Sequence, residues 1–226
     1  MKVLFVGEGN HDIGPAGEAW GQPRPARGVV PMLARRVCPS IDAASVALPW
    51  RELSRLSPNA RKGLEDKVAA AITISALRFG CEGTVCVSDR DRDADRLEAL
   101  KRGKRRGLEV LGAPHTAAVG VAVESIEAWT LGATQDIAEE LGIAADRVRE
   151  ALTAKHVEAL SESSGNEEHR PKALLDRIAS LARQRDGTVF RCAVAERTEV
   201  EDLRAACPEG FNPFADELRA AFEPPH

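Results

Sequence analysis

Three aspartates follow a short apolar stretch near the middle of the chain, in the segment TVCVSDRDRD at residues 84–93. The β-branched and apolar residues 84–87 are typical of a buried strand in a parallel sheet. Asp89, Asp91 and Asp93 come directly after them, and carboxylates that alternate along an extended segment point the same way. Because such carboxylates can share one hard cation, we expect a divalent metal site here, with Mg²⁺ or Mn²⁺ as the ion.

The same segment also has an interpretation without a metal. Arg90 and Arg92 alternate with the acids and could neutralise them in a solvated loop. Asp91 or Asp93 could instead cap the following helix, since aspartate is a preferred N-cap residue. The choice depends on what else reaches this end of the strand.

A second apolar stretch opens the chain and also ends in a carboxylate. Residues 2–7, KVLFVG, predict a strand, and Glu8 follows it, with Gly9 allowing a sharp turn. Ligands of open α/β sheets bind at the carboxyl ends of the strands. If both strands lie in one parallel sheet, we expect Glu8 to face Asp89 and Asp91.

A third predicted strand, at residues 116–123, ends in Glu124. Glu127 lies one helical turn further on and would share a face with Glu124. We expect Glu124 to be a further metal ligand, directly or through water, with Glu127 behind the ligands. The alternative is that both acids only complement the positive amino-terminus of a helix.

A long glycine- and proline-rich segment, residues 9–27, separates the first strand from the next element. Connections of this length are usually functional or mobile, so we expect it to border the site. Asn10, His11, Asp12 and Glu18 in this segment could reach the metal or the substrate. For His11, simple exposure to solvent is the alternative.

Basic residues gather on the helix predicted at residues 95–111. The formal net charge of −4 does not indicate a nucleic-acid-binding protein, but binding depends on local patches. We expect this cluster, together with Arg90 and Arg92, to hold phosphates; the alternative is a solvated helix face. The cluster consists of Lys101, Arg102, Lys104, Arg105 and Arg106.

Apolar runs and helical periodicity predict the elements that must position these residues. They indicate an α/β fold with a mainly parallel sheet of about four strands flanked by helices. We expect residues 1–133 to form the catalytic α/β domain and residues 134–226 a helical C-terminal extension packed on it. Strands are predicted at 2–7, 45–48, 84–87 and 116–123, and C-terminal helices at 134–141, 144–152, 155–160, 171–184 and 213–222.

The acid after the first strand and the D-x-D after a later one resemble the Toprim domain, the catalytic module shared by topoisomerases, bacterial primases and several nucleases. In that family the glutamate is a general acid or base and the aspartates hold magnesium. The resemblance implies the first role for Glu8 and the second for Asp89 and Asp91.

Four short motifs extend this resemblance over nearly the whole chain: E-G after the first strand, S-D-R-D-R-D, V-E-S-I-E-A-W and a terminal C-P-x-x-F-x-x-F. Together they are similar to a family of uncharacterised bacterial Toprim-like proteins. Families of this kind occur beside ABC-type ATPases in phage-defence loci. The resemblance therefore implies nuclease activity and an ABC-type ATPase as a partner.

Composition narrows the choice of function. The chain has 226 residues, no tyrosine and no P-loop motif, which excludes a tyrosine-dependent topoisomerase and an ATPase site of its own. The five cysteines form no C-x-x-C pair, which argues against structural zinc. No apolar run reaches about 18 residues, so we expect a cytoplasmic protein without a membrane partner.

These features predict a divalent-metal-dependent nuclease that hydrolyses phosphodiester bonds of DNA or RNA, with Glu8, Asp89 and Asp91 as its catalytic residues. Two other interpretations stay open. The first is a non-catalytic Toprim-like subunit that binds an ATPase or nucleic acid. The second is a small-molecule phosphohydrolase that uses the same acidic edge.

Overall fold

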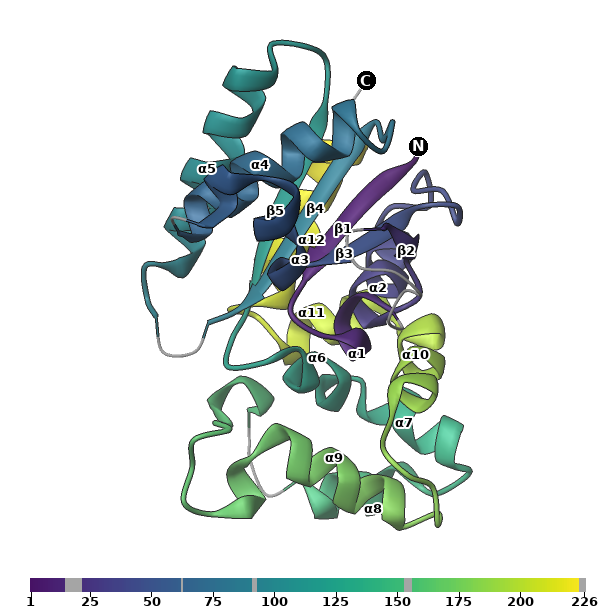
Figure 1. Cartoon of the computed structure of the whole chain (residues 1–226). Coiled ribbons are helices and arrows are strands. Elements are labelled where there is room, and N and C mark those ends of the chain that lie inside the picture. The colour runs from purple at the N-terminus through teal and green to yellow at the C-terminus, as the bar shows by residue number, and fades with distance from the viewer. Residues whose placement is uncertain (15–21, 62, 91–92, 153–155, 224–226) are drawn as a thin grey trace.

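The computed structural model describes residues 1–14, 22–61, 63–90, 93–152 and 156–223, and shows a five-stranded sheet flanked by helices (Figure 1). The strands are ordered β2-β3-β1-β4-β5, and all pairs except β2–β3 are parallel. The expected α/β fold with a mainly parallel sheet is therefore confirmed. Its strands are β1 (Val3–Gly7), β2 (Arg24–Pro25), β3 (Val46–Pro49), β4 (Gly83–Asp89) and β5 (Thr116–Ala122).

The strand count exceeds the expected four because of β2. This strand has two residues, of which one is a proline, and it pairs antiparallel with β3 at the sheet edge. Proline cannot donate to a ladder and is tolerated at an edge. A segment this short has no apolar period in the sequence, so only its tertiary pairing identifies it.

The chain reverses its winding direction around β1. From β1 it passes to β3 on one side, and from β3 it crosses to β4 on the other side. The carboxyl ends of β1 and β4 therefore flank a topological switch point, where open α/β sheets bind ligands. Glu8 and Asp89 are the residues at these two strand ends.

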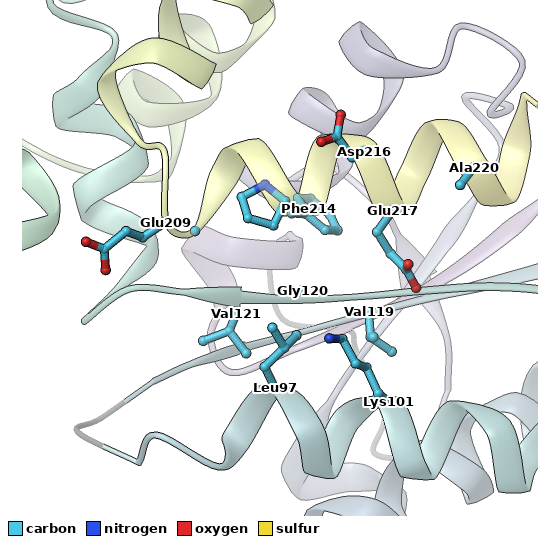
Figure 2. A pocket seen from close by; sticks show the side chains of 12 residues that line it. Leu97, Lys101, Val119, Gly120, Val121, Glu209, Phe214, Asp216, Glu217 and Ala220 are labelled. Atoms are coloured by element: carbon cyan, nitrogen blue, oxygen red, sulfur yellow. The ribbon is translucent and has the colours of Figure 1, made fainter.

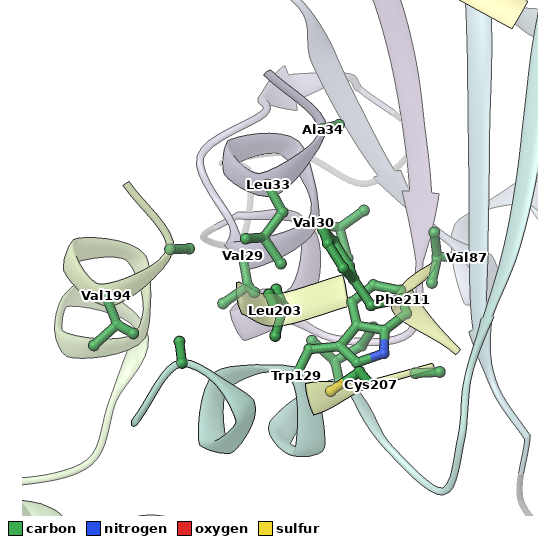
Figure 3. Close-up of a cluster of buried hydrophobic side chains, with 14 of the residues drawn as sticks. Val29, Val30, Leu33, Ala34, Val87, Trp129, Val194, Leu203, Cys207 and Phe211 are labelled. Carbon is green, nitrogen blue, oxygen red and sulfur yellow. The ribbon is translucent and has the colours of Figure 1, made fainter. Parts of the chain in front are cut away.

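Alternating strand residues divide the core into two layers. Leu4 and Val6 pack with one hydrophobic cluster, which includes residues of α3 (Trp50–Leu56), α4 (Leu64–Leu77) and α5 (Arg96–Leu111). Val3 and Phe5 point to the opposite face, where the second cluster includes α2 (Val29–Val37) and α12 (Phe211–Phe222), as Figure 3 shows in part. The sheet is thus buried on both faces, as expected for parallel strands.

Glycines set the close approach of α4 and α5. A Cβ atom on Gly103 would lie 2.7 Å from the Cβ of Val68 and 2.6 Å from the carbonyl oxygen of Glu65. The absence of a side chain at Gly103 therefore allows the two helices to approach closely.

The C-terminal half is helical, as expected, and shares the core with the sheet. Trp129 stacks on Phe214 of α12 with ring centroids 5.4 Å apart, and Phe211 meets Trp129 edge-on at the same distance. Apart from α12, which lies along the sheet, the helices of this part gather toward the carboxyl ends of the strands (Figure 1). They are α6 (Ile126–Gly132), α7 (Thr134–Leu141), α8 (Ala145–Ala151), α9 (Pro171–Ser180), α10 (Thr188–Arg197) and α11 (Val200–Ala206).

Several local details differ from the expectations. A short helix, α1 (Asn10–Ile13), lies in the segment expected as a loop. Of the helix predicted at 155–160, residue 155 lies outside the described residues, and residues 156–160 contain a 3-10 turn (Val157–Ala159) and no α-helix. Neither α10 nor α11 was expected. The division of the chain at residue 133 stays a prediction. No helix in the described ranges is long and apolar enough to cross a membrane.

Candidate functional site at the carboxyl edge of the sheet

The strand register brings Glu8 and the end of β4 together. Val6 of β1 pairs with Cys86 of β4, which puts Glu8 level with Ser88. The Ser88 hydroxyl donates a hydrogen bond to Glu8 Oε1 at 2.9 Å. Two chain segments 80 residues apart are thereby joined at the switch point, next to Asp89.

Asp89 connects β4 to the first turn of α6. Its Oδ1 accepts a hydrogen bond from the backbone N–H of Ile126 at 3.1 Å. On the other side of the strand end, Arg96 donates to the backbone carbonyl of Asp89 and, at 3.4 Å, to the Ser88 hydroxyl. Ser125 is buried beside Ile126, and its hydroxyl has no hydrogen-bond partner among the described residues.

Asp12 brings another carboxyl group to the same edge. Its Oδ2 accepts a hydrogen bond from the backbone N–H of Gly9 at 2.7 Å, and the residue is only 8% exposed. Burial raises the pKa of Asp12, and the nearby negative charges of Glu127 and Glu8 act in the same direction. The Gly9 hydrogen bond and the charge of Arg191 oppose this shift without reversing it.

Glu127 is 4% exposed and lies in a buried charge network. Arg191 of α10 donates to its Oε1 at 2.6 Å and is itself paired with Asp186. Lys172 at the start of α9 approaches the same oxygen at 3.9 Å, with 61% of its side chain exposed. Burial acts to raise the pKa of Glu127, but Arg191 and Lys172 hold it below its ordinary value.

Glu124 follows β5 in a backbone conformation that is unusual for a residue with a side chain, with φ of 64°. Its carboxylate lies 4.0 Å from Arg90 Nη2, and the other end of the Arg90 guanidinium lies 3.8 Å from Glu209. These contacts direct Glu124 toward Arg90, and a role as a metal ligand stays a prediction.

Of the other two aspartates in the segment 84–93, the structure describes Asp93 but not Asp91. Asp91, together with Arg92, lies outside the described residues. Asp93 accepts from the backbone N–H of Asp95 at 3.1 Å and lies 3.7 Å from Arg96, at the start of α5. Asp93 thus stabilises the turn before α5, but the N-cap residue of that helix is Asp95, so capping by Asp93 is not observed. No contact of Asp93 with the other acids is found within the described part of the chain.

His11 lies at the edge of the site and contacts α10 rather than an acid. Its Nδ1 is 2.8 Å from the hydroxyl of Thr188. This contact helps to seat α1 against α10, so a structural role accounts for His11 without a ligand. A direct part in metal or substrate binding stays a prediction.

The basic cluster on α5 is largely paired with carboxylates. Arg102 binds Glu65 at 2.9 Å, and Lys101 binds Glu98 at the same distance. The other two pairs are Lys104 with Glu217 at 2.6 Å and Arg106 with Asp66 at 2.7 Å. Arg105 is exposed. The pairing favours the solvated-face alternative, and phosphate binding by this cluster stays a prediction.

The donor chemistry at the edge fits a hard divalent cation, because carboxylate and hydroxyl oxygens predominate and all five cysteines lie buried as free thiols. The partnerless Ser125 hydroxyl beside Asp89 supplies a further oxygen. Among the described residues, however, no group of three or more acids, histidines or cysteines is arranged to hold a metal ion. Asp91, the second residue of the D-x-D pair, lies outside that set.

Three side chains at the edge were not expected from the sequence: Ser88, Arg96 and Arg191. Arg191 had a visible signal, because it is the single charged residue in the apolar run VFRCAVA. A lone cation among buried apolar residues indicates a buried counter-ion. Ser88 and Arg96 gave no signal of their own.

Comparison of the chain with protein-family models, with curated proteins and with solved structures gives no significant match. Any function assigned to the site therefore rests on its own residues and their geometry.

Proposed function

We propose that the protein is a Toprim-like, divalent-metal-dependent nuclease that hydrolyses phosphodiester bonds of DNA or RNA. The observation that carries this proposal is the meeting of Glu8 with the end of β4 at the switch point, through the 2.9 Å hydrogen bond from Ser88. Acids that meet at the carboxyl edge of an open α/β sheet are candidates for a catalytic site. The Toprim-like identity, phage defence and an ABC-type ATPase partner rest on the sequence motifs alone.

Asp89 and Asp91 would hold Mg²⁺ or Mn²⁺, with Asp93 or Glu124 as further ligands. The buried Asp12, next to Glu8, offers another carboxyl group. A bound divalent cation supplies positive charge where the phosphate oxygens become more negative during hydrolysis.

The chain's own groups have separate tasks in this proposal. Glu8 takes a proton from the attacking water or gives one to the leaving oxygen, and the Ser88 hydroxyl fixes the direction of its carboxylate. Arg96 holds Ser88 and the end of β4 in place. Lys172, exposed and beside Glu127, is a cation that would contact a phosphate at the rim.

A non-catalytic Toprim-like subunit is the second candidate, and two observations favour it. No metal-binding group forms among the described residues, and the α5 cations pair with carboxylates. In that case the acidic edge would bind a partner protein and would not turn over a substrate. A small-molecule phosphohydrolase using the same acids is not favoured by any separate observation.

The test is a cleavage assay with Mg²⁺ and with Mn²⁺ on single- and double-stranded DNA and RNA, and on mononucleotides. We compare the wild type, Asp89→Ala combined with Asp91→Ala, and the matched control Asp146→Ala, an exposed acid on α8. Polymer cleavage that the double variant loses and the control keeps supports the nuclease. Phosphate release from mononucleotides alone indicates the phosphohydrolase. Metal binding with no cleavage by any variant indicates the non-catalytic subunit.

A further inference from the structure

Arg90 directly follows Asp89 and lies between carboxylates of two other segments. Its backbone N–H donates to the carbonyl of Ala122 at 2.9 Å, which fixes the residue beside the end of β5. Its guanidinium lies 4.0 Å from Glu124 and 3.8 Å from Glu209, and 34% of the side chain is exposed. Both distances exceed the length of a hydrogen bond, so Arg90 compensates the two acids only loosely.

The segment that carries Glu209 is held in place by a buried carboxylate. Glu158 accepts hydrogen bonds from the backbone N–H groups of Glu209 at 2.8 Å and Gly210 at 2.7 Å. Burial raises the pKa of Glu158, and these hydrogen bonds and the charge of Arg90 oppose the shift. The side chain of Glu209 points away from the cavity between α5 and α12 (Figure 2). The backbone of Glu209 is therefore fixed where its side chain reaches Arg90.

Glu124 is directed toward Arg90 from an unusual backbone conformation. Its φ of 64° is rare for a residue with a side chain, and such strain is concentrated at functional sites. Only 16% of its side chain is exposed, and Arg90 is the only cation within 4.0 Å of it among the described residues. A carboxylate with one distant partner keeps its affinity for a hard divalent cation, so Glu124 can exchange Arg90 for a metal.

We propose that Arg90 and the divalent cation of the proposed metal site compete for Glu124, and that Glu209 holds Arg90 when Glu124 binds the metal. This inference rests on the proposed function. A cation shifts such an equilibrium by the difference between its affinities for the two arrangements, so a loose pair is exchanged more readily than a tight one. Arg90 is thus a positioning residue that sets how strongly the carboxyl edge binds a metal.

The test is calorimetric titration with Mn²⁺ of the full chain as wild type, Arg90→Gln, Glu209→Gln and the combination of both. Arg90→Gln removes the competitor and should strengthen Mn²⁺ binding about threefold, in keeping with the small energy of a partly exposed ion pair. Glu209→Gln leaves Glu124 as the ion-pair partner of Arg90 and should weaken Mn²⁺ binding about twofold. The combined variant should bind Mn²⁺ as Arg90→Gln does, because Glu209 acts only through Arg90.

The matched control is Arg149→Gln, which removes the same charge from α8 and should leave the Mn²⁺ affinity unchanged. If Glu209 acted on the metal through its charge alone, Glu209→Gln would weaken Mn²⁺ binding equally with and without Arg90, and that result would overturn the proposal. An unchanged affinity in Arg90→Gln would also overturn it, while Mn²⁺ binding and cleavage by the wild type would still support the nuclease. Absence of Mn²⁺ binding in every form would overturn both this inference and the proposed metal site.

Discussion

The carboxyl edge of the sheet and the exposed face of α5 both concentrate charge, but they do so in different ways. On α5 each paired cation meets an acid at the surface, such as Arg102 with Glu65, whose side chains are 50% and 36% exposed. At the edge Asp12 and Glu127 are nearly buried, Asp89 is half-buried and Glu8 is exposed, and these acids come from neighbouring segments. The charged residues at the edge are thus partly buried, whereas those on α5 lie mostly at the surface.

The difference indicates where chemistry is to be expected. Exposed ion pairs contribute little to stability and leave the charges fully solvated. Buried carboxyl groups are unfavourable unless they are compensated, and they persist mainly where function requires them. We therefore place the proposed chemistry at the edge and expect a surface role for α5.

The largest expected effect is on catalysis at the edge. Glu8→Gln removes the proton-transfer group and should lower the rate of phosphodiester cleavage about a thousandfold. The matched substitution on α5, Glu98→Gln, removes an exposed partner of Lys101 and should leave the rate within about twofold, because an exposed pair contributes little. Single-turnover kinetics measure the cleavage rates of both variants. An equal loss of rate in the two would contradict the placement of the chemistry at the carboxyl edge.

The next effect is on stability. Arg191→Met leaves Glu127 and Asp186 buried without their cation and should lower the free energy of unfolding by about 3 kcal/mol or more. Arg149→Met breaks the exposed pair with Asp146 and should change it by less than about 1 kcal/mol. Urea denaturation measures both values. A small loss for Arg191→Met would show that the edge network is not a compensated buried cluster.

A smaller effect concerns the salt dependence of nucleic-acid binding. The measurement uses a Glu8→Gln background, which prevents cleavage. In it, Lys172→Ala should reduce the magnitude of the slope of log affinity against log salt concentration by about 1, the change expected for the loss of one phosphate contact. Arg102→Ala on α5 should change the slope less, because Glu65 already binds that guanidinium. Fluorescence anisotropy across a salt series measures the slopes. A larger change of slope for Arg102→Ala than for Lys172→Ala would indicate that the basic cluster on α5 binds the phosphates.

The smallest effect is a pH-dependent difference in stability. Because burial raises the pKa of Asp12 above its ordinary value of 3.8, its charged form destabilises the fold at any pH above the raised pKa. Asp12→Asn should therefore be more stable than the wild type near neutral pH, and the gap should close as the pH falls toward 3.8. Thermal denaturation between pH 4 and pH 7.5 measures the difference in stability between the variant and the wild type. A difference that does not depend on pH would contradict a raised pKa of Asp12.

The sequence predicted β1, β4 and β5 well because each is a largely apolar run that is followed by, or ends in, an acidic residue. The strand predicted at 116–123 is observed as Thr116–Ala122, and that at 84–87 as Gly83–Asp89. The convergence of Glu8 with the end of β4 follows from parallel pairing, which the apolar runs imply.

Contacts between distant segments could not be predicted in the same way. Arg191 and Glu127 are 64 residues apart, and α10 has no apolar spacing that marks it as a helix. Its run of β-branched and apolar residues is compatible with a strand as well as a buried helix. The hydrogen bond from the Ile126 amide to the Asp89 carboxylate is also a tertiary contact that no local pattern indicates.

Calorimetric titration of the full chain with Mn²⁺ tests whether the carboxyl edge of the sheet binds a divalent metal. We expect saturable binding in the wild type, with at least a tenfold loss of affinity in Asp89→Ala and no change in Glu98→Gln. Binding that Asp89→Ala retains in full, or that Glu98→Gln abolishes, would contradict a metal site at the carboxyl edge of the sheet.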